Sequence, residues 1–161
     1  MVLLIESLIL CALFTLPIII ASKNPITMIH DYPPAIIEKV RELGLIDETQ
    51  TRKSKKSIIK KSFAAILFVF LLAAAVRYAN GADSFGKGFF YAYILWTIVN
   101  WYDVIFMDII WFCHDKRYII PGTEGMKEYK DYMFHIKGGF IGMLYGLPVA
   151  LIVGTIVAVL N

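Results

Sequence analysis

Charged residues are scarce in this 161-residue chain. Asp, Glu, Lys and Arg together make up 18% of the sequence, and 58% of it is hydrophobic. Soluble domains are about 45–50% apolar and about 25% charged. The composition therefore excludes an ordinary soluble domain and predicts an integral membrane protein.

Cysteine is rarer still, because only Cys11 and Cys113 occur and they form no CxxC pair. Both lie in hydrophobic stretches, which is typical of small buried apolar residues and argues against a thiol–disulfide relay. Catalytic motifs are missing as well: the sequence has no HExxH, no GxSxG and no glycine-rich phosphate loop. No enzyme class can be assigned from a motif.

Four hydrophobic stretches approach or exceed the ~20 residues that a helix needs to cross a bilayer. They cover residues 2–20, 62–79, 89–113 and 138–160. The first stretch has no basic residue before Lys23, so it is interpreted as a permanent span and not as a signal peptide. We expect an all-α integral membrane protein with four transmembrane helices in a single domain, residues 1–161.

Basic residues gather in the two loops that join these stretches. Fourteen of the sixteen Lys and Arg lie in residues 21–61 or 114–137, and the positive-inside rule places such loops in the cytoplasm. The chain is then expected to be a multi-pass protein of the cell membrane with both termini outside.

Each cytoplasmic loop has the pattern of a short amphipathic helix. In the first loop, Pro33 and Pro34 suit a helix start and Gly44 suits its C-terminal cap. In the second loop, apolar residues share one face of a helix that contains Met126, Tyr129, Met133 and Ile136.

A basic segment without acidic residues lies between Arg52 and Lys61, directly before the second stretch. Next to a membrane span, such a segment attracts anionic lipid headgroups at about 1 kcal/mol per charge. It has no interleaved aromatic residues, so no nucleic-acid partner is expected.

Small residues recur at every fourth position of the last stretch. The series is Gly138, Gly142, Gly146, Ala150, Gly154 and Ala158. A small-xxx-small pattern lets another helix backbone approach closely in a membrane. It predicts a packing face, either within one chain or at the interface of a homo-oligomer.

Two carboxylates interrupt the third stretch. An ionised carboxylate at the bilayer centre costs at least ~2.5 kcal/mol, so Asp103 is expected to face the bundle interior or a wet cavity. An α-helix turns about 100° per residue, which places Asn100, Asp103 and His114 on one stripe. Asp108 falls on another stripe, so the two acids are expected to point in different directions.

Polar residues in and after the third stretch provide candidate ligands of two kinds. A cation or proton would bind at Asn100 and Asp103. An anionic headgroup would bind at Lys116 and Arg117, which can hold phosphate oxygens.

A divalent metal is a further candidate cofactor, because imidazoles and carboxylates are suitable ligands. The candidate ligands are His114, Asp131 and His135. If such a metal activates a water molecule, the candidate catalytic residues are Asp103, Asp108, His114 and His135.

Three classes of function are compatible with these features, and they leave open whether the protein is an enzyme. The favoured interpretation is a small polytopic membrane protein with a polar, cytoplasm-facing site for a cation, a proton or an anionic headgroup. One alternative is a membrane-interface, metal-dependent hydrolase or transferase that acts on a lipid-linked substrate. The other is a non-catalytic membrane subunit that packs through its glycine ladder.

Overall fold

The computed structural model describes residues 2–47 and 55–160, and every regular element within them is a helix. The elements are α1 (Val2–Ala21), η1 (Pro25–Asp31), α2 (Pro34–Glu42), α4 (Lys55–Ala74), η2 (Ala75–Ala79), α5 (Phe85–Tyr102), η3 (Asp103–Phe112), η4 (Lys116–Tyr118), η5 (Lys127–Lys130) and α6 (Tyr132–Val159). Helices η1, η4 and η5 are 3₁₀ helices, whereas η2 and η3 are π-helices. The basic segment between Arg52 and Lys61 lies outside the residues whose side chains the structure describes.

Three helical runs are long and apolar enough to cross a membrane. They are Val2–Ala21 (α1), Phe85–Phe112 (α5 with η3) and Tyr132–Val159 (α6), with mean hydropathies of 2.5, 1.3 and 2.2. These runs fit a membrane protein, because about 20 apolar residues suffice to cross a bilayer. The other predicted span, residues 62–79, overlaps a shorter apolar helix, Ala65–Ala79.

Two of the long helices begin before their predicted starts. α5 begins at Phe85 instead of residue 89, and α6 begins at Tyr132 instead of residue 138. At the start of α6, the Asp131 carboxylate accepts a hydrogen bond of 3.0 Å from the Phe134 N–H, which satisfies an otherwise unpaired amide of the first turn. The separate amphipathic helix predicted in the second loop is therefore wrong. Part of it is η5, Lys127–Lys130, and the rest is the start of α6.

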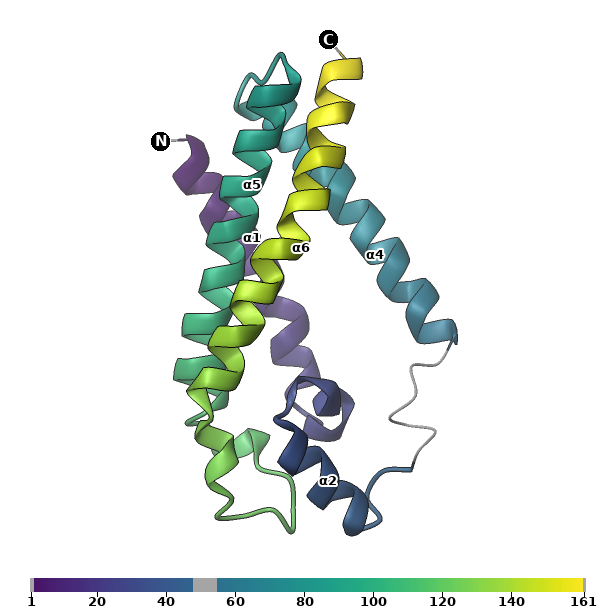
Figure 1. Ribbon diagram of the computed structural model, residues 1–161, viewed down its shortest axis with the longest axis vertical. Coiled ribbons are helices and arrows are strands. Elements are labelled where there is room, and N and C mark those ends of the chain that lie inside the picture. Colours follow the sequence, from purple (N-terminus) through teal and green to yellow (C-terminus); the bar gives the residue numbers. More distant parts are fainter. Residues whose placement is uncertain (1, 48–54, 161) are drawn as a thin grey trace.

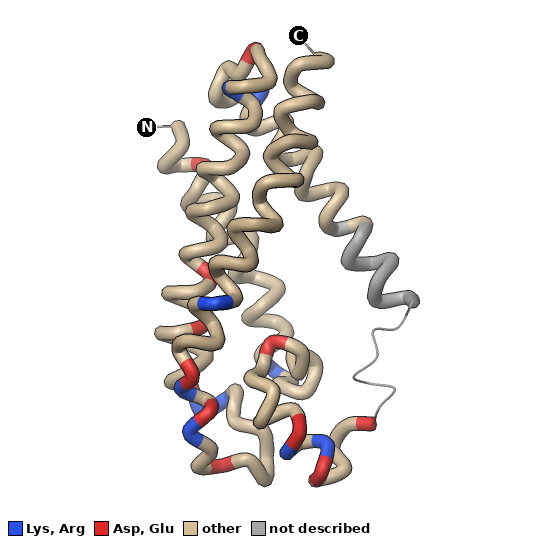
Figure 2. The backbone as a smooth tube through the Cα atoms, in the orientation of Figure 1, with Lys and Arg blue, Asp and Glu red and all other residues tan. Residues whose placement is uncertain are grey.

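The helices place the two loops at one end of the molecule and both chain ends toward the other (Figure 1). We call these the loop end and the terminal end. α4 lies beside α6 near the terminal end and diverges from it toward the loop end (Figure 1). Most of the charged residues that Figure 2 colours lie toward the loop end.

Close contact between α5 and α6 is made by small residues. A Cβ atom added at Gly88 of α5 would lie 3.0 Å from the Gly154 Cα of α6. Further along, the Trp96 indole fills the space beside Gly146 and donates its N–H to the Gly142 carbonyl at 2.9 Å. Small residues of α6 thus face α5 of the same chain, so a homo-oligomer through this face would have to displace α5.

The predicted ladder of small residues departs from the structure at both ends. Gly138 has open space around it and Ala158 is exposed, whereas Gly139 and Val157 are buried. Each step of four residues turns an α-helix about 40° past a full turn. The first and last residues of a six-residue ladder therefore point to different sides of a straight helix, so the six residues cannot all contact one neighbouring helix. Most of the buried residues of α6 lie three, four or seven positions apart, the spacing of left-handed helix packing. They are His135, Gly139, Gly146, Ala150, Val153, Gly154 and Val157.

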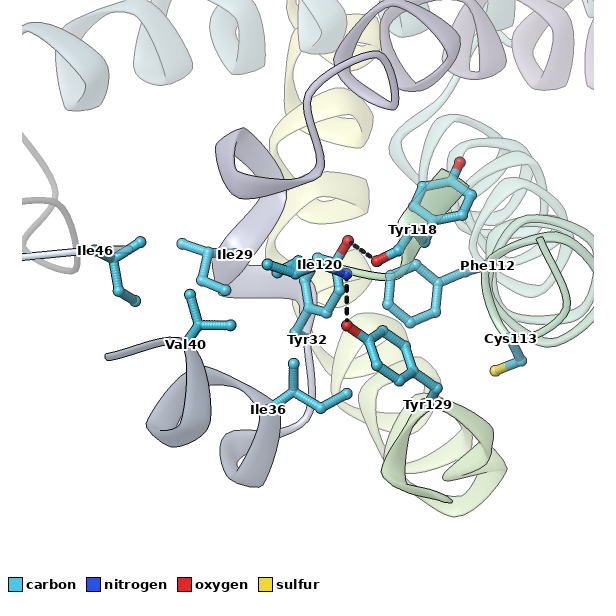
Figure 3. Close-up of a cluster of buried hydrophobic side chains, with 10 residues drawn as sticks. All are labelled: Ile29, Tyr32, Ile36, Val40, Ile46, Phe112, Cys113, Tyr118, Ile120 and Tyr129. Atoms are coloured by element: carbon cyan, nitrogen blue, oxygen red, sulfur yellow. Dashed lines mark hydrogen bonds between the residues drawn. The ribbon is translucent and has the colours of Figure 1, made fainter. Parts of the chain in front are cut away.

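The two loops pack against each other around a shared hydrophobic core (Figure 3). This loop core consists of Ile29, Tyr32, Ile36, Val40, Ile46, Phe112, Cys113, Tyr118, Ile120 and Tyr129. Tyr32 of the first loop donates its O–H to the Tyr118 carbonyl of the second loop at 2.8 Å. The helix α2 of the first loop begins at Pro34 and ends before Gly44, whose φ of 69° suits a helix stop.

Candidate functional site

A cavity of about 650 Å³ lies at the loop end, between α1, η1, η3 and the start of α6. The polar residues that line it are His30, Asp31, Asn100, Asp103, Asp108, His135 and Lys137. Among these described residues, three carboxylates share the cavity with two imidazoles and one ammonium group. The other lining residues are mainly apolar.

The π-helix η3 brings Asp103 and Asp108 to the same cavity. A π-helix joins residues five positions apart by hydrogen bonds, as the Cys113 N–H shows by donating to the Asp108 carbonyl at 2.9 Å. Residues five apart, such as these two acids, therefore lie one above the other. The prediction that they point in different directions is wrong, because it assumed α-helical rotation through residues that form a π-helix.

The second acid, Asp108, is held by His135 of α6. The His135 Nδ1 atom lies 3.1 Å from Asp108 Oδ2, and the His135 side chain is only 4% exposed. The rings of Phe112 and Phe134 pack edge-on against the imidazole, with centroid distances of 5.3 and 5.2 Å. These rings hold the imidazole in place, so His135 is the partner of Asp108 within the protein.

Asp103 has no such partner. It is partly buried and lines the cavity, and no described side chain donates a hydrogen bond to it or forms an ion pair with it. Its predicted neighbour Asn100 also lines the cavity, but the Asn100 Nδ2 atom donates to the Gly139 carbonyl at 3.0 Å. Asn100 thus joins α5 to α6, and Asp103 is the lining carboxylate most available to a ligand.

The three predicted metal ligands are not brought together. His114 is exposed; its Nδ1 atom lies 2.9 Å from the Ile109 carbonyl oxygen and its Nε2 atom 3.3 Å from the Tyr132 hydroxyl. Asp131 is used as the cap of α6, and His135 pairs with Asp108. The π-helical rotation of η3 moves His114 off the stripe of Asp103. Within residues 2–47 and 55–160, no three His, Cys, Asp or Glu side chains form a group that could hold a metal ion.

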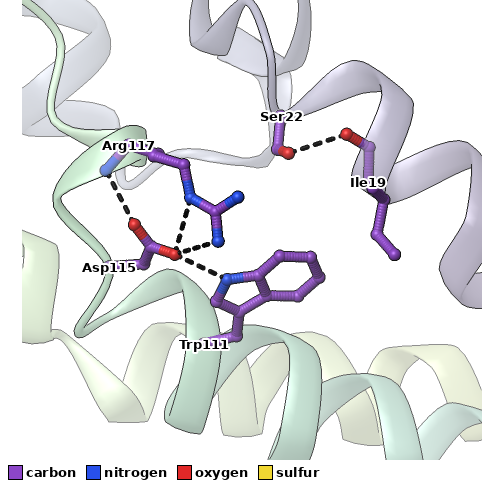
Figure 4. A network of polar contacts seen from close by, with 5 residues as sticks. All are labelled: Ile19, Ser22, Trp111, Asp115 and Arg117. Atoms are coloured by element: carbon purple, nitrogen blue, oxygen red, sulfur yellow. Dashed lines mark hydrogen bonds and ion pairs between the residues drawn. The ribbon is translucent and has the colours of Figure 1, made fainter.

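Lys116 and Arg117, the predicted headgroup ligands, lie outside the cavity in η4. The Asp115 carboxylate accepts hydrogen bonds from Arg117 Nη2 at 2.6 Å and from Trp111 Nε1 at 2.7 Å (Figure 4). The hydrogen bonds from Arg117 hold the pKa of Asp115 well below its usual range. Because Asp115 already engages Arg117, the exposed Lys116 is the more available of the two.

Three polar residues of the cavity are not among the predicted site residues. His30 and Asp31 belong to η1, and Lys137 belongs to α6. The one signal in the sequence is the His-Asp dipeptide, which occurs at residues 30–31 and again at 114–115. The dipeptide marks polar groups beside apolar helices, but only the packing of η1 shows which copy lines the cavity.

Comparison with protein-family models, with curated proteins and with solved structures finds no match for this chain. A function therefore has to be argued from the chemistry of the cavity itself. That chemistry is dominated by carboxylates at the loop end of an apolar bundle.

Proposed function

We propose that this protein is a polytopic protein of the cell membrane that binds a positively charged ligand in the cavity at its loop end. The observation that carries the proposal is Asp103, which lines the cavity without a hydrogen-bonding or ionic partner among the described side chains. An ionised carboxylate within an apolar span is costly without a partner. A bound cation or proton removes that cost.

The other charges of the lining favour a cation over an anionic headgroup. Asp31 and Asp108 add carboxylates, whereas Lys137 is the one ammonium group of the described lining. An anionic ligand would meet more negative than positive charge, and this repulsion is stronger near a protein interior than in water.

The proposed topology has the loop end in the cytoplasm and both termini outside. It counts the apolar helix Ala65–Ala79 as a fourth span, and it follows from the fourteen basic residues in the two loops. A phosphatase reporter fused after Asn161 should be active only if it is exported, and one inserted at Gly125 should be inactive. An inactive fusion after Asn161 with an active insertion at Gly125 would reverse the topology.

Thermal unfolding of the detergent-purified protein tests the cation site. Methylammonium chloride should raise the melting temperature more than sodium chloride does at equal ionic strength. The reason is that a ligand bound only by the folded state stabilises that state. The gain is about 2.7 kcal/mol at a hundredfold excess over Kd. Asp103→Asn should abolish the response, because it removes the charge and keeps the size of the side chain.

A matched control is Glu38→Gln, which neutralises an exposed carboxylate of α2 and should leave the response intact. If methylammonium affects the wild type and Asp103→Asn equally, Asp103 binds no cation and the proposal fails.

A further inference from the structure

The cavity is much larger than a proton or a bare metal ion requires. Its volume of about 650 Å³ lies within the range of about 300–1,000 Å³ that is typical of sites for small organic molecules. The size therefore points to an organic cation.

The walls of the cavity also contain many apolar side chains. They include Phe14 and Ile18 of α1, Met107 of η3, and Phe134 and Ile141 of α6. Such walls favour aliphatic groups, because burying apolar surface is favourable in proportion to its area. The cavity therefore offers a ligand both carboxylates and apolar surface.

Two residues of these walls are also exposed. Phe14 is 36% exposed and Ile141 is 52% exposed. Both belong to helices that are apolar and long enough to cross a membrane, α1 and α6. With α1 and α6 crossing a bilayer, as proposed above, these exposed side chains place the cavity next to the lipid chains.

We infer that the ligand is an amphipathic amine, that is, a molecule with one protonated amino group and an aliphatic chain. The inference rests on the proposed role of Asp103 as the cation-binding carboxylate. The amino group binds Asp103, and the chain lies along Phe14, Ile18 and Ile141. The ligand enters from the bilayer between α1 and α6.

Binding of tritiated dodecylamine to the full chain in phosphatidylcholine nanodiscs tests the inference, with empty nanodiscs as the blank. We expect saturable, equimolar binding that unlabelled dodecylamine displaces, whereas dodecanol and methylammonium at the same concentration do not. Asp103→Asn should weaken binding about tenfold or more, because it removes a charge-assisted hydrogen bond.

A second pair of variants tests the apolar wall independently of Asp103. Ile141→Trp narrows the cavity and should weaken binding, whereas Leu144→Trp, at a 66% exposed position of α6 that does not line the cavity, should not. This pair still decides the question if Asp103→Asn does not fold.

The inference is overturned if dodecylamine does not bind saturably, or if dodecanol displaces it equally well. It is also overturned if Asp103→Asn or Ile141→Trp, once folded, binds like the wild type. If methylammonium stabilises the wild type through Asp103 while dodecylamine does not bind, the ligand is a small cation and only the inference fails. If neither amine acts through Asp103, the proposed function fails as well.

Discussion

The helical run Phe85–Phe112 meets α6 in different ways in its two halves. Near the terminal end it is α-helical, and a Cβ at Gly88 would lie only 3.0 Å from the Gly154 Cα. At the loop end it is π-helical, and Asp103, Asp108 and the facing residues of α6 line a cavity of about 650 Å³. The π-helical half also touches α6, because a Cβ at Gly139 would lie 2.7 Å from Val104 Cγ2, but here a cavity lies beside the contact.

Two side chains of α5 mark the boundary between these halves. The Trp96 indole N–H donates to the Gly142 carbonyl at 2.9 Å, and the Asn100 amide donates to the Gly139 carbonyl at 3.0 Å. Both bonds join α5 to the backbone of α6. The first lies outside the cavity, whereas Asn100 and Gly139, which form the second, line it. We therefore expect the glycine contact to serve stability, whereas the π-helical half holds Asp103, a carboxylate without a partner among the described side chains.

The largest effect is expected where the helices are closest. Gly146→Leu should lower the free energy of unfolding by about 3 kcal/mol, because the added side chain collides with the Trp96 indole. Gly138→Leu is the matched control, since nothing lies within 4 Å of a Cβ at that position of the same helix. Thermal unfolding in detergent measures both, and equal losses would mean that α5 and α6 are not in close contact.

A smaller loss is expected from the paired acid of the cavity. Asp108→Ala should lower the free energy of unfolding by about 2 kcal/mol, because it leaves the buried His135 Nδ1 without its partner. At the terminal end, Asp83→Ala removes an exposed ion pair with Lys87 and should have no measurable effect. If both variants unfold at the wild-type temperature, the His135 contact does not stabilise the fold.

The loop core should respond to pH through Tyr32. Burial raises the pKa of Tyr32 above the ordinary value of 10.0. The contribution of Tyr32 to the free energy of unfolding is therefore complete below pH 10 and is lost as the pH rises further. Tyr32→Phe should lower the free energy of unfolding by about 1 kcal/mol at neutral pH, because the Tyr118 carbonyl loses its donor. The variant should also lose less stability than the wild type when the pH is raised above 10.

Unfolding measured between neutral and alkaline pH tests this prediction. Tyr145→Phe, at a 65% exposed position of α6, is the control and should match the wild type throughout. If Tyr32→Phe loses as much stability as the wild type at alkaline pH, other groups cause the loss.

The smallest loss of stability is expected at Asp103. Asp103→Asn should not lower the free energy of unfolding by more than about 0.5 kcal/mol, because no described side chain depends on that carboxylate. The variant should still lose the response to methylammonium. A loss of stability as large as that of Asp108→Ala would make Asp103 a structural acid and would erase the difference between the two.

Several features could be predicted from the sequence because they depend on composition or on local backbone preferences. Long apolar runs locate the three helices that can cross a membrane, because a span needs about 20 apolar residues wherever it lies in the fold. Pro34 and Gly44 bound α2, since proline suits the first turn of a helix and glycine readily takes a positive φ. The same reasoning gave Asp103 a place in the bundle interior or a wet cavity, because an ionised acid is too costly in lipid.

Only the tertiary structure decided which of these residues meet. The choice between α- and π-helix over Asp103–Phe112 shifts each backbone hydrogen bond by one residue, and hydrophobic periodicity does not reveal it. That shift brings Asp108 to the cavity of Asp103 and moves His114 away from it. Asp31 reaches the same cavity from a loop distant in sequence, because the two loops share a hydrophobic core. Contacts between distant segments depend on the packing of the whole chain, and no local pattern in the sequence encodes them.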